Sequence, residues 1–455
     1  MLAALKPYPA MKDSGVESLG EIPEHWDIRK LRQTLKRCTE RNRSDLPLLS
    51  VVREKGVILR DMDNLEENHN FIPDDLSNYK VVREGQFAMN KMKAWQGSYG
   101  VSSYEGIVSP AYFIFDLSGI EGNFFHAAIR SRAYVPDFTR ASDGVRIGQW
   151  DLAESRMREI CFATPPIPEQ TAIVRYLDYV DRRVRRLVRA KRKLITLLKE
   201  QKQAIIHRAV TLGLDPNVPL KDSGIKWLGK VPEHWLVTRV KNEFFCLNAH
   251  RLPLNGPERG AMTSREYDYY GASGAIDKVD NYIFDDELLL IAEDGANLVL
   301  RNLPLAIIAR GKFWVNNHAH ILKPKKGNLR YLAALMELLD YRPWISGAAQ
   351  PKLTKDRIMA ISIIVAPPCE QDQIIEFILS ETDQLSTSII HTEHEIKLLN
   401  EYRIRLIADV VTGKLDVREA AAALPKVDLL ETDASDNILD TDIEEMGATP
   451  EEMEA

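Results

Sequence analysis

Residues 169–212 read EQTAIVRYLDYVDRRVRRLVRAKRKLITLLKEQKQAIIHRAVTL, and the organisation of the whole chain follows from them. The stretch contains neither Pro nor Gly, and its apolar residues recur at alternating steps of four and three. This spacing predicts a long amphipathic helix with a heptad stripe, in which Lys191 and Gln201 are polar members. The apolar members are Ile173, Leu177, Val180, Val184, Leu187, Leu194, Leu198 and Ile205.

A second stretch, residues 370–413, carries the same pattern. Its stripe consists of Ile375, Ile378, Leu385, Ile389, Ile396, Leu399 and Leu406, with Thr382, Thr392 and Arg403 as weaker members. Each helix would be about 65 Å long at 1.5 Å per residue, too long to bury its stripe against one small domain. We therefore expect the two helices to pack on each other, antiparallel, with a globular domain at each end.

The chain also contains an internal repeat. The segment KDSGVESLGEIPEHW at Lys12–Trp26 recurs as KDSGIKWLGKVPEHW at Lys221–Trp235, with ten of fifteen positions identical. PPIPEQ, ending at Gln170, and PPCEQ, ending at Gln371, precede the two helices, and Val-Thr closes each helix. The chain is thus two copies of one unit: a leading segment, a globular region, Pro-Pro, Glu-Gln and a long helix.

The residues shared by the two copies are interpreted as structural. Gly and Pro form turns, and a Trp that follows a turn usually anchors a core. His25 and its counterpart receive the same structural interpretation. An acidic residue at the start of each helix, Glu169 or Glu370, suits the positive end of the helix dipole.

Composition describes an ordinary globular chain. Its 455 residues, 45% hydrophobic and 28% charged, suffice for two or three cores. Charged residues interrupt the most apolar stretch, residues 282–310, so we expect no membrane span, and the N-terminus lacks a secretory signal. Four scattered cysteines without metal-ligand spacing (Cys38, Cys161, Cys246 and Cys369) predict a reduced, metal-free, cytoplasmic protein.

Charge is unevenly distributed. The net charge is −6, yet residues 416–455 hold thirteen acidic against two basic residues. The remaining chain is therefore mildly basic, at +5, which permits a nucleic-acid partner without demanding one. We expect the acidic tail to be disordered, because it has few aromatic residues and little periodicity.

The globular regions differ from each other in sequence. Short apolar runs such as Tyr112–Phe115, together with a helical candidate at Arg330–Leu339, predict mixed α+β domains. A repeated framework with dissimilar inserts is what a protein needs in order to present two recognition surfaces on one scaffold. The expected boundaries are 1–165 for the first domain, 166–212 for its helix, 213–366 for the second domain, 367–415 for its helix and 416–455 for the tail.

Motifs for catalysis are missing from the sequence. Pro165-Pro166 and Pro367-Pro368 lack the Asn/Asp-Pro-Pro-aromatic context of an amino-methyltransferase, and no Gly-Lys step is followed by Ser or Thr as in a P-loop. Neither a GxSxG nor an HExxH signature is present. Asp74-Asp75 followed by Lys80 faintly resembles a nuclease motif but is typical of a turn. We expect a non-catalytic chain.

Basic and aromatic residues in the inserts are the candidate DNA contacts. Arg and Asn can read guanine and adenine edges, whereas Lys mostly holds phosphates. The first region contributes Lys91, Lys93, Trp95, Arg130, Arg132, Arg140 and Arg146. The second contributes Arg265, Tyr270, Arg301, Arg310, Lys312, Asn316 and Asn317. The basic run at residues 181–193 is interpreted instead as pairing with acidic residues of the second long helix.

At this point the chain resembles a known family, the DNA specificity (S) subunits of Type I restriction-modification systems. The resemblance rests on the duplicated KDSG…PEHW segment, the Pro-Pro…Glu-Gln helix starts and the ending VTGKLD at Val411–Asp416. Tyr104–Tyr112 is also similar to a segment of such recognition domains. The first helix departs from the pattern by ending in Val-Thr-Leu-Gly, and the acidic tail lies outside it.

The resemblance implies a non-catalytic subunit that reads a bipartite double-stranded DNA sequence, one half per target recognition domain, with the helical pair setting the spacing. Two methyltransferase (M) subunits and further restriction (R) subunits would bind to it. S-adenosylmethionine, ATP and Mg²⁺ would belong to those partners, and this chain would need no cofactor. The sequence leaves two alternatives open: a coiled-coil scaffold that never binds DNA, and an orphan S subunit that acts as an antirestriction decoy.

Overall fold

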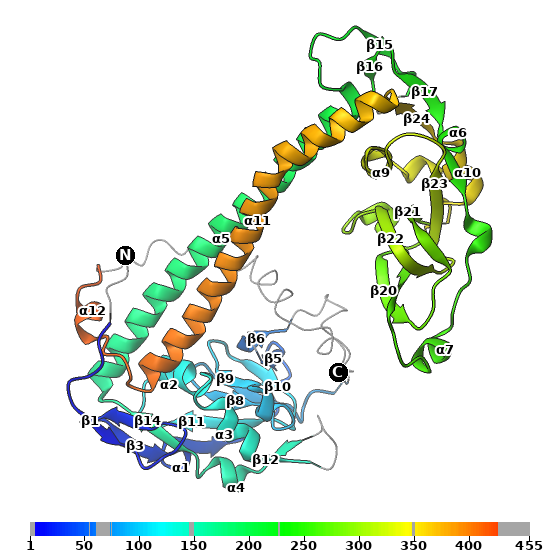
Figure 1. Ribbon diagram of the computed structural model, residues 1–455. Coiled ribbons are helices and arrows are strands. Elements are labelled where there is room, and N and C mark those ends of the chain that lie inside the picture. The colour runs from blue at the N-terminus through cyan, green and yellow to red at the C-terminus, as the bar shows by residue number, and fades with distance from the viewer. Residues whose placement is uncertain are drawn as a thin grey trace. The chain divides into compact units, whose positions relative to one another are not determined.

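The computed structural model describes residues 5–53, 55–60, 73, 75–144, 150–225, 228–347 and 351–425 (Figure 1). The chain divides into two compact units. Unit 1 combines residues up to Val188 with those from Lys397 onward, and unit 2 comprises Arg189–Ile396. Each unit contains one globular domain and a part of both long helices, so neither unit is a continuous segment of the repeat.

The two long helices are α5, Ile167–Leu212, and α11, Pro368–Val411. Contacts inside unit 2 establish their antiparallel direction. Lys191 Nζ lies 2.6 Å from Glu395 Oε2, whereas Lys202, further along α5, donates to Ser386 Oγ at 2.8 Å, earlier on α11. The predicted antiparallel pairing is confirmed. The Lys191–Glu395 contact also agrees with pairing of the basic run of α5 with acidic residues of α11.

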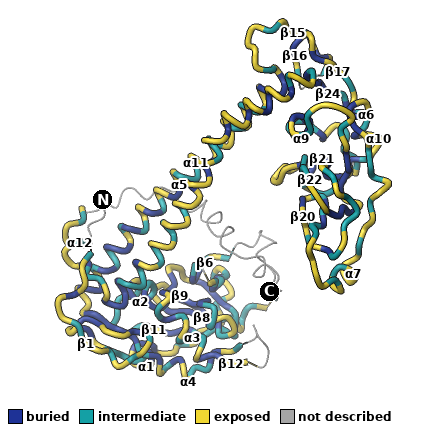
Figure 2. The backbone as a smooth tube through the Cα atoms, in the orientation of Figure 1, coloured by how far each residue is buried: buried dark blue, intermediate teal, exposed yellow. Residues whose placement is uncertain are grey.

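The predicted stripe is correct for α11 and shifts by one residue in α5. Along α11, Ile389, Thr392 and Leu406 are among the buried members, as expected. Buried and exposed segments alternate along this helix (Figure 2). In α5, Leu187 and Leu194 are 44% and 45% exposed, whereas Val188 and Ile195 are 3% and 9% exposed. The pattern could not distinguish them, because each pair consists of two adjacent apolar residues. The buried residues step by four from Val184 to Val188, where the heptad pattern predicts a step of three. This step shifts the seam, the line of buried residues between the two long helices, by one position.

Unit 1 contains short strands and helices around one four-stranded sheet. They are β1 Met11–Asp13, β2 Glu21–Pro23, β3 Asp27–Lys30, α1 Leu31–Thr34, β4 Leu35–Cys38, β5 Leu49–Val52, β6 Gly56–Leu59, β7 Lys80–Val82, β8 Phe87–Met89, η1 Ala94–Gln96, β9 Tyr99–Val101, β10 Gly106–Val108, β11 Phe113–Leu117, α2 Gly122–Ile129, α3 Val135–Arg140, β12 Ser142–Asp143, β13 Asp151–Leu152, α4 Glu154–Met157, β14 Cys161–Thr164 and α12 Arg418–Ala422. Aromatic rings fill the core, with Phe125 against Phe87 and Phe162 at 5.2 and 5.4 Å. Each such ring contributes roughly 1.5–3 kcal/mol by leaving water.

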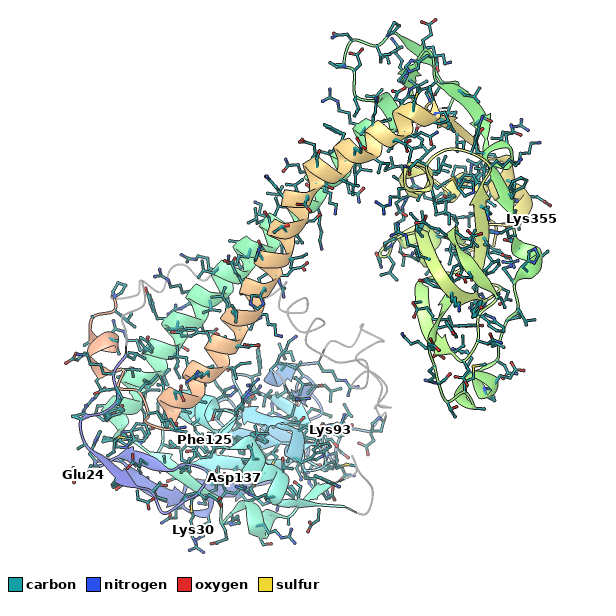
Figure 3. All side chains as sticks on the ribbon, viewed as in Figure 1. Glu24, Lys30, Lys93, Phe125, Asp137 and Lys355 are labelled. Carbon is teal, nitrogen blue, oxygen red and sulfur yellow. The ribbon has the colours of Figure 1, made fainter. Side chains whose placement is uncertain are left out.

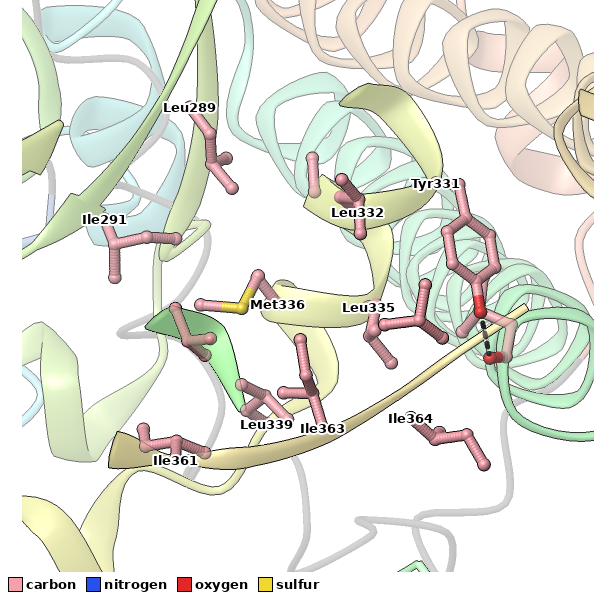
Figure 4. Close-up of a cluster of buried hydrophobic side chains, with 14 of the residues drawn as sticks. Leu289, Ile291, Tyr331, Leu332, Leu335, Met336, Leu339, Ile361, Ile363 and Ile364 are labelled. Atoms are coloured by element: carbon pink, nitrogen blue, oxygen red, sulfur yellow. Dashed lines mark hydrogen bonds between the residues drawn. The ribbon is translucent and has the colours of Figure 1, made fainter. Parts of the chain in front are cut away.

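Unit 2 is built around a larger sheet of six strands. Its elements are β15 Leu220–Asp222, β16 Lys230–Pro232, β17 Leu236–Arg239, α6 Val240–Glu243, β18 Phe244–Cys246, η2 Asn248–His250, α7 Gly256–Gly260, β19 Tyr267–Gly271, β20 Gly274–Val279, β21 Phe284–Ala292, α8 Asn297–Leu300, β22 Ala306–Val315, β23 Ala319–Pro324, α9 Leu329–Leu338, η3 Arg342–Trp344, α10 Lys355–Ala360 and β24 Ser362–Val365. One face of α9 buries Leu332, Leu335 and Met336 against Leu289 and Ile363 (Figure 4).

The repeat extends into the globular regions, where the sequences had diverged. The sheet of unit 1 has the strand order β4-β11-β8-β9, and the sheet of unit 2 contains the order β18-β23-β21-β22. Antiparallel strands also flank each domain equivalently, since β3 pairs with β14 and β17 with β24. In unit 2, β19 and β20 extend the sheet beyond β22. Both domains therefore share one framework, and the prediction of mixed α+β domains is confirmed.

A junction at the start of each long helix uses the residues that the repeat preserves. In unit 1, Trp26 Nε1 donates to Glu169 Oε1 at 3.0 Å and His25 Nε2 lies 2.7 Å from Glu169 Oε2. In unit 2, Trp235 and His234 contact Glu370 Oε2 at 3.1 and 2.8 Å. The structural interpretation of these residues is confirmed, because the Glu carboxylate ties the leading segment to the first turn of the helix.

The glutamine that follows and the glycine that ends the other helix complete each junction. Gln170 Nε2 donates to Pro165 O and Gln371 Nε2 to Ala366 O, both at 2.7 Å. At the end of α11, a Cβ on Gly413 would lie 3.2 Å from the Trp26 ring. Each junction thus joins the start of one long helix to the end of the other.

The acidic tail begins later than predicted. Asp416 N donates to Lys6 O at 2.8 Å, and α12 follows, with Val417 and Ala421 buried. Arg175 of α5 donates to Leu424 O at 2.8 Å. Residues 416–425 are therefore ordered, in contrast to the expectation for them, because two apolar side chains and a backbone bridge attach them to unit 1. Residues 426–455 lie outside the described residues.

Candidate nucleic-acid interface

The shared sheet places an equivalent set of loops at one of its edges in each unit. In unit 1, β11 pairs antiparallel with β4 and β8, bringing Cys38 opposite Ile114 and Met89 opposite Phe113. The residues after β4, those after β8 and those before β11 therefore meet at one edge. We call this the loop edge; in unit 1 it comprises residues 39–42, 90–98, 109–112, 142–144 and 150–152.

The loop edge of unit 2 forms in the same way. Ala292, which ends β21, lies opposite Ala319, which begins β23. Arg251, after β18 and η2, donates to Ala319 O at 3.0 Å and so brings a third loop to this edge. The loop edge of unit 2 comprises residues 247–251, 293–305, 316–318, 346–347 and 351–353.

One hydrogen bond braces each loop edge against the chain that leaves the domain. Leu152 N donates to Lys91 O at 2.9 Å, and Leu353 N donates to Glu293 O at 2.7 Å. Each donor lies in or directly after a short antiparallel pairing: Leu152 pairs with Ser142, and Leu353 follows the pairing of Ser346 with Lys352. The two domains thus hold the same loops by the same brace, although the side chains on them differ.

In unit 2 a charged network holds the loops. Glu293 is 8% exposed and forms an ion pair with Arg251 and another, at 3.4 Å, with Lys352. Burial favours the neutral carboxyl group, but the hydrogen bonds from Arg251 and Lys352 and the electrostatic effects of His320 and Arg251 together outweigh it and keep the pKa of Glu293 below its usual range. The carboxylate is therefore charged at neutral pH and fixes two cations from separate loops.

His320 lies fully buried under this network. Its Nε2 is 2.7 Å from Leu353 O, so this nitrogen donates, and Nδ1 accepts from Asn248 Nδ2 at 2.8 Å. Burial lowers the pKa of His320, which keeps the ring neutral at pH 7. A neutral imidazole in one tautomer can therefore link η2 to the segment before α10. This role is structural and carries no chemistry.

In unit 1 the loop after β8 is aromatic. Trp95 lies with its ring centroid 5.2 Å from that of Trp150, and its carbonyl accepts from Thr139. Lys93 is exposed at the start of η1 (Figure 3), and Lys91 Nζ lies 2.9 Å from Asp151 Oδ2. Of the predicted contacts of unit 1, these three lie at the loop edge: Lys91, Lys93 and Trp95.

Three predicted contacts of unit 2 also lie close together. Asn316 N donates to Tyr270 O at 3.0 Å, while Asn316 Oδ1 accepts from His318 N at 2.7 Å. Asn316 is 5% exposed and shapes the turn, whereas its neighbour Asn317 is exposed. Of this cluster, Asn317 is the side chain most accessible to a ligand.

Other predicted residues are engaged in structural contacts. Arg130 donates to Tyr99 O at 3.1 Å and to Arg53 O at 2.9 Å, and Arg301 donates to Leu339 O at 3.0 Å. These guanidinium groups hold backbone segments of their own domains. Such roles do not test whether the residues contact DNA, which stays a prediction.

The remaining predicted residues lie away from the loop edges. Arg310 pairs with Glu287 at 2.6 Å in the middle of the sheet, and Lys312 lies 4.8 Å from the centre of the Tyr282 ring. Arg265 N donates to Asp280 Oδ1 at 2.7 Å, before β19. Arg132 is exposed between α2 and α3, and Arg140 pairs with Asp137. Arg146 lies outside the described residues.

Sequence reasoning missed several residues of the loop edges. Arg251 and Glu293 belong to them, and Lys80 of β7 reaches the loop edge of unit 1, where its Nζ donates to Tyr112 O at 2.6 Å. Asp75 accepts from Ser77 N at 2.8 Å and so forms the expected turn. Strand order brings these residues to the loop edges, and no local pattern in the sequence predicts strand order.

Among the described residues, no group of three or more His, Cys, Asp or Glu side chains could hold a metal ion. None of the helices within the described ranges has the length and apolarity that crossing a membrane requires.

Comparisons with known proteins agree with this architecture. Residues 258–399 match the family described as the Type I restriction modification DNA specificity domain. A Haemophilus influenzae protein named as a type I restriction enzyme specificity subunit is 34% identical over 134 residues, which span 29% of this chain and 33% of that protein. A Methanocaldococcus jannaschii protein, named as the MjaX specificity subunit, is 19% identical over 88% of this chain and 96% of its own.

A solved structure shares the fold. A chain from a study of complex assembly and conformational transition of the type I R-M system superposes with a TM-score of 0.61 at 13% identity, covering 87% of this chain and 99% of that one. Residues 258–399 are thus similar to the Type I restriction modification DNA specificity domain, and along most of its length the chain is similar to a protein named as a type I restriction enzyme specificity subunit.

Proposed function

We propose that this chain is the DNA-reading subunit of a type I restriction-modification complex and that each of its two globular domains recognises one half of a bipartite target. The observation that carries this proposal is the loop edge. Two domains with the same strand order and the same brace present different side chains on the same loops. A constant framework with variable loops is suited to reading two different base sequences.

The partners and the chemistry are part of the same proposal. Two methyltransferase subunits and the restriction subunits bind to the framework, and S-adenosylmethionine, ATP and Mg²⁺ act in those subunits. The described residues of this chain lack a metal-ligand cluster, and its sequence lacks nucleotide-binding motifs. In this proposal its contribution is placement: it selects where on the duplex the methyltransferases act.

Methylation mapping tests the proposal. The chain is co-produced with the methyltransferase subunit encoded beside it, and N6-methyladenine is mapped across the host genome by single-molecule sequencing. One bipartite motif, with two short specific parts and a fixed non-specific spacer, is the expected result. The methyltransferase produced alone serves as the control, and it should leave the motif unmodified.

The alternatives give different results. A coiled-coil scaffold predicts no salt-dependent DNA affinity, whereas a DNA-reading subunit predicts a log–log slope set by the number of phosphates it contacts. A soluble complex with the methyltransferase that neither methylates nor binds DNA would contradict the proposal. A complex that binds the duplex without methylating it would favour the decoy.

A further inference from the structure

Lys80 is the buried cation of the unit 1 loop edge. It begins β7 opposite Val108 of β10, and the next residue, Val81, donates its backbone N–H to Glu40 O at 2.9 Å. The residue is only 6% exposed, and the hydrogen bond from its Nζ to Tyr112 O is part-buried. The aliphatic stem is therefore inside the domain while the ammonium group lies near its surface.

Lys80 has no counter-ion in the part of the chain that the structure describes. Lysine is almost never buried unless it is paired. Burial and then the charges of Arg37, Arg41 and Lys91 lower the pKa of Lys80, so its electrostatic surroundings are cationic. A neutral carbonyl, that of Tyr112, is its hydrogen-bond acceptor.

Nearby carboxylates are already engaged with other cations. Glu154 pairs with Arg37, and Asp151 pairs with Lys91 at 2.9 Å. Glu40, next to β7, pairs with Arg83 at 2.9 Å. Among the described residues, the positive charge of Lys80 is therefore left without a carboxylate partner, and the exposed Arg41 adds to it.

The equivalent edge of unit 2 provides a contrast. There the inward cation is Arg251, whose guanidinium contacts Asn317 O at 3.1 Å and forms an ion pair with Glu293. Unit 2 thus neutralises this partly buried cation with a carboxylate of its own. Unit 1 uses the same strand framework, but none of its described carboxylates pairs with Lys80. An external anion would complete the unit 1 edge.

We propose that Lys80, with Arg41 and Lys91 beside it, binds a backbone phosphate of DNA at the first recognition domain. This inference rests on the proposed function and adds to it a named contact. An ammonium group that donates one N–H to Tyr112 O has two more N–H groups for phosphate oxygens. Phosphate is the anion that a duplex presents along its whole length. The contact positions the domain and carries no sequence information.

A purely structural role for Lys80 is the competing explanation, and Lys221 provides the matched control. Lys221 Nζ also donates to backbone carbonyls, those of Glu233 and Trp235, at 2.6 and 2.7 Å. It lies in the leading segment of unit 2, away from the loop edge. Lys80→Met and Lys221→Met therefore remove the same type of contact from two different places.

The experiment measures DNA binding against salt. The full chain, in complex with its methyltransferase subunits, is titrated by fluorescence anisotropy with a duplex that carries the mapped motif, from about 0.05 to about 0.3 M salt. Lys80→Met should reduce the magnitude of the log–log slope by about one and weaken binding about fivefold at ~0.15 M. Lys80→Arg and Lys221→Met should keep the wild-type slope.

Unfolding provides the second readout. Replacing an unpaired buried charge with an apolar side chain of similar size is often neutral or stabilising, so Lys80→Met should unfold at or above the wild-type midpoint. A folded Lys80→Met with the wild-type slope would overturn the phosphate site. If that variant does not fold, Lys80→Gln is judged by the same slope. A wild-type complex that shows no salt-dependent binding would instead refute the proposed function itself.

Discussion

Single residues show how the repeat is used. Glu169 and Glu370 each accept from a Trp and contact a His, so one carboxylate holds the leading segment against the first helical turn in each unit. These contacts account for the retention of Pro-Glu-His-Trp in both copies. In unit 1, Tyr8 adds a third hydrogen bond to Glu169 at 2.6 Å.

His126 should make unit 1 sensitive to acid. Its Nδ1 accepts from Val101 N at 3.1 Å, and burial together with the Arg130 charge lowers its pKa to about 4. The unfolded chain, with a His pKa near ~6.5, binds the proton first. Stability is therefore full above about pH 6.5 and is lost as pH falls toward about 4, by roughly 2–3 kcal/mol.

Urea unfolding at about pH 7 and about pH 4.5 checks this expectation. His126→Asn keeps a hydrogen-bond acceptor that does not titrate. Its free energy of unfolding should therefore fall less in acid than that of the wild type. His391→Asn, exposed on α11, is the control and should behave like wild type. Equal acid losses in His126→Asn and wild type would show that other groups dominate.

Gly413 should tolerate no side chain. Its φ is +76°, and a Cβ would lie 2.7 Å from Pro23 Cγ and 3.2 Å from Trp26. Gly20 has φ +63° with nothing within 4 Å, so Gly20→Ala isolates the backbone strain, about 1–2 kcal/mol. Gly413→Ala should cost about 1–3 kcal/mol more, measured by chemical unfolding. Similar losses in the two variants would mean that the junction adapts.

At the scale of elements, the seam between the long helices separates what the sequence could and could not predict. The heptad stripe of α11 is confirmed: of the adjacent pair Ile389-Ile390, for example, the predicted member Ile389 is 9% exposed and its neighbour 65%. In α5, Leu187-Val188 and Leu194-Ile195 are adjacent apolar pairs, and only packing against α11 selects the second member of each. The presence and length of each helix follow from local periodicity, and their antiparallel direction follows from the connectivity of the chain. All three were therefore predictable.

Substitutions along α5 test the shifted seam. Val188→Asp places a charge at a 3% exposed position and should cost at least about 3 kcal/mol. Leu187→Asp, at a 44% exposed position, should change stability by about 0.5 kcal/mol or less. Thermal unfolding of the two variants compares them directly. A larger loss of stability in Leu187→Asp than in Val188→Asp would support the seam predicted from the sequence.

The loop edges could not be predicted in the same way. Lys91, Lys93 and Trp95 were found because they follow one another in a Gly-containing loop. Lys80 and Arg251 reach their loop edges through strand pairing with distant segments, and strands of three or four residues carry little periodicity of their own. Arg130 and Arg301 were selected as basic loop residues, but backbone carbonyls hold their guanidinium groups.

For the whole molecule, the shared framework predicts modular specificity. Exchange of residues 27–164 for the corresponding region of another specificity subunit should change one half of the methylated motif and leave the other half intact. The reason is that the braces and junctions at the ends of the exchanged region are common to both copies. Motif mapping reads the result, and a change in both halves would contradict independent reading.

Helix length should set the spacer of the motif. The Lys191–Glu395 pair defines the register, so deletion of residues 191–197 together with 389–395 removes matching heptads. At 1.5 Å per residue the pair shortens by roughly 10 Å, about three base pairs, and the mapped spacer should shrink accordingly. Deletion of four residues from α5 alone breaks the seam and should abolish assembly. An unchanged spacer after the matched deletion would refute this expectation.

The division of both long helices between the units also has a consequence for synthesis of the chain on the ribosome. Unit 1 needs residues from Lys397 onward, which are made about two hundred residues after Val188. At ~5–20 residues per second, that interval is roughly 10–40 s. During it the α5 seam has no partner, and its exposed apolar residues are open to other nascent chains or to a chaperone. The first-made domain is thus among the last to be completed.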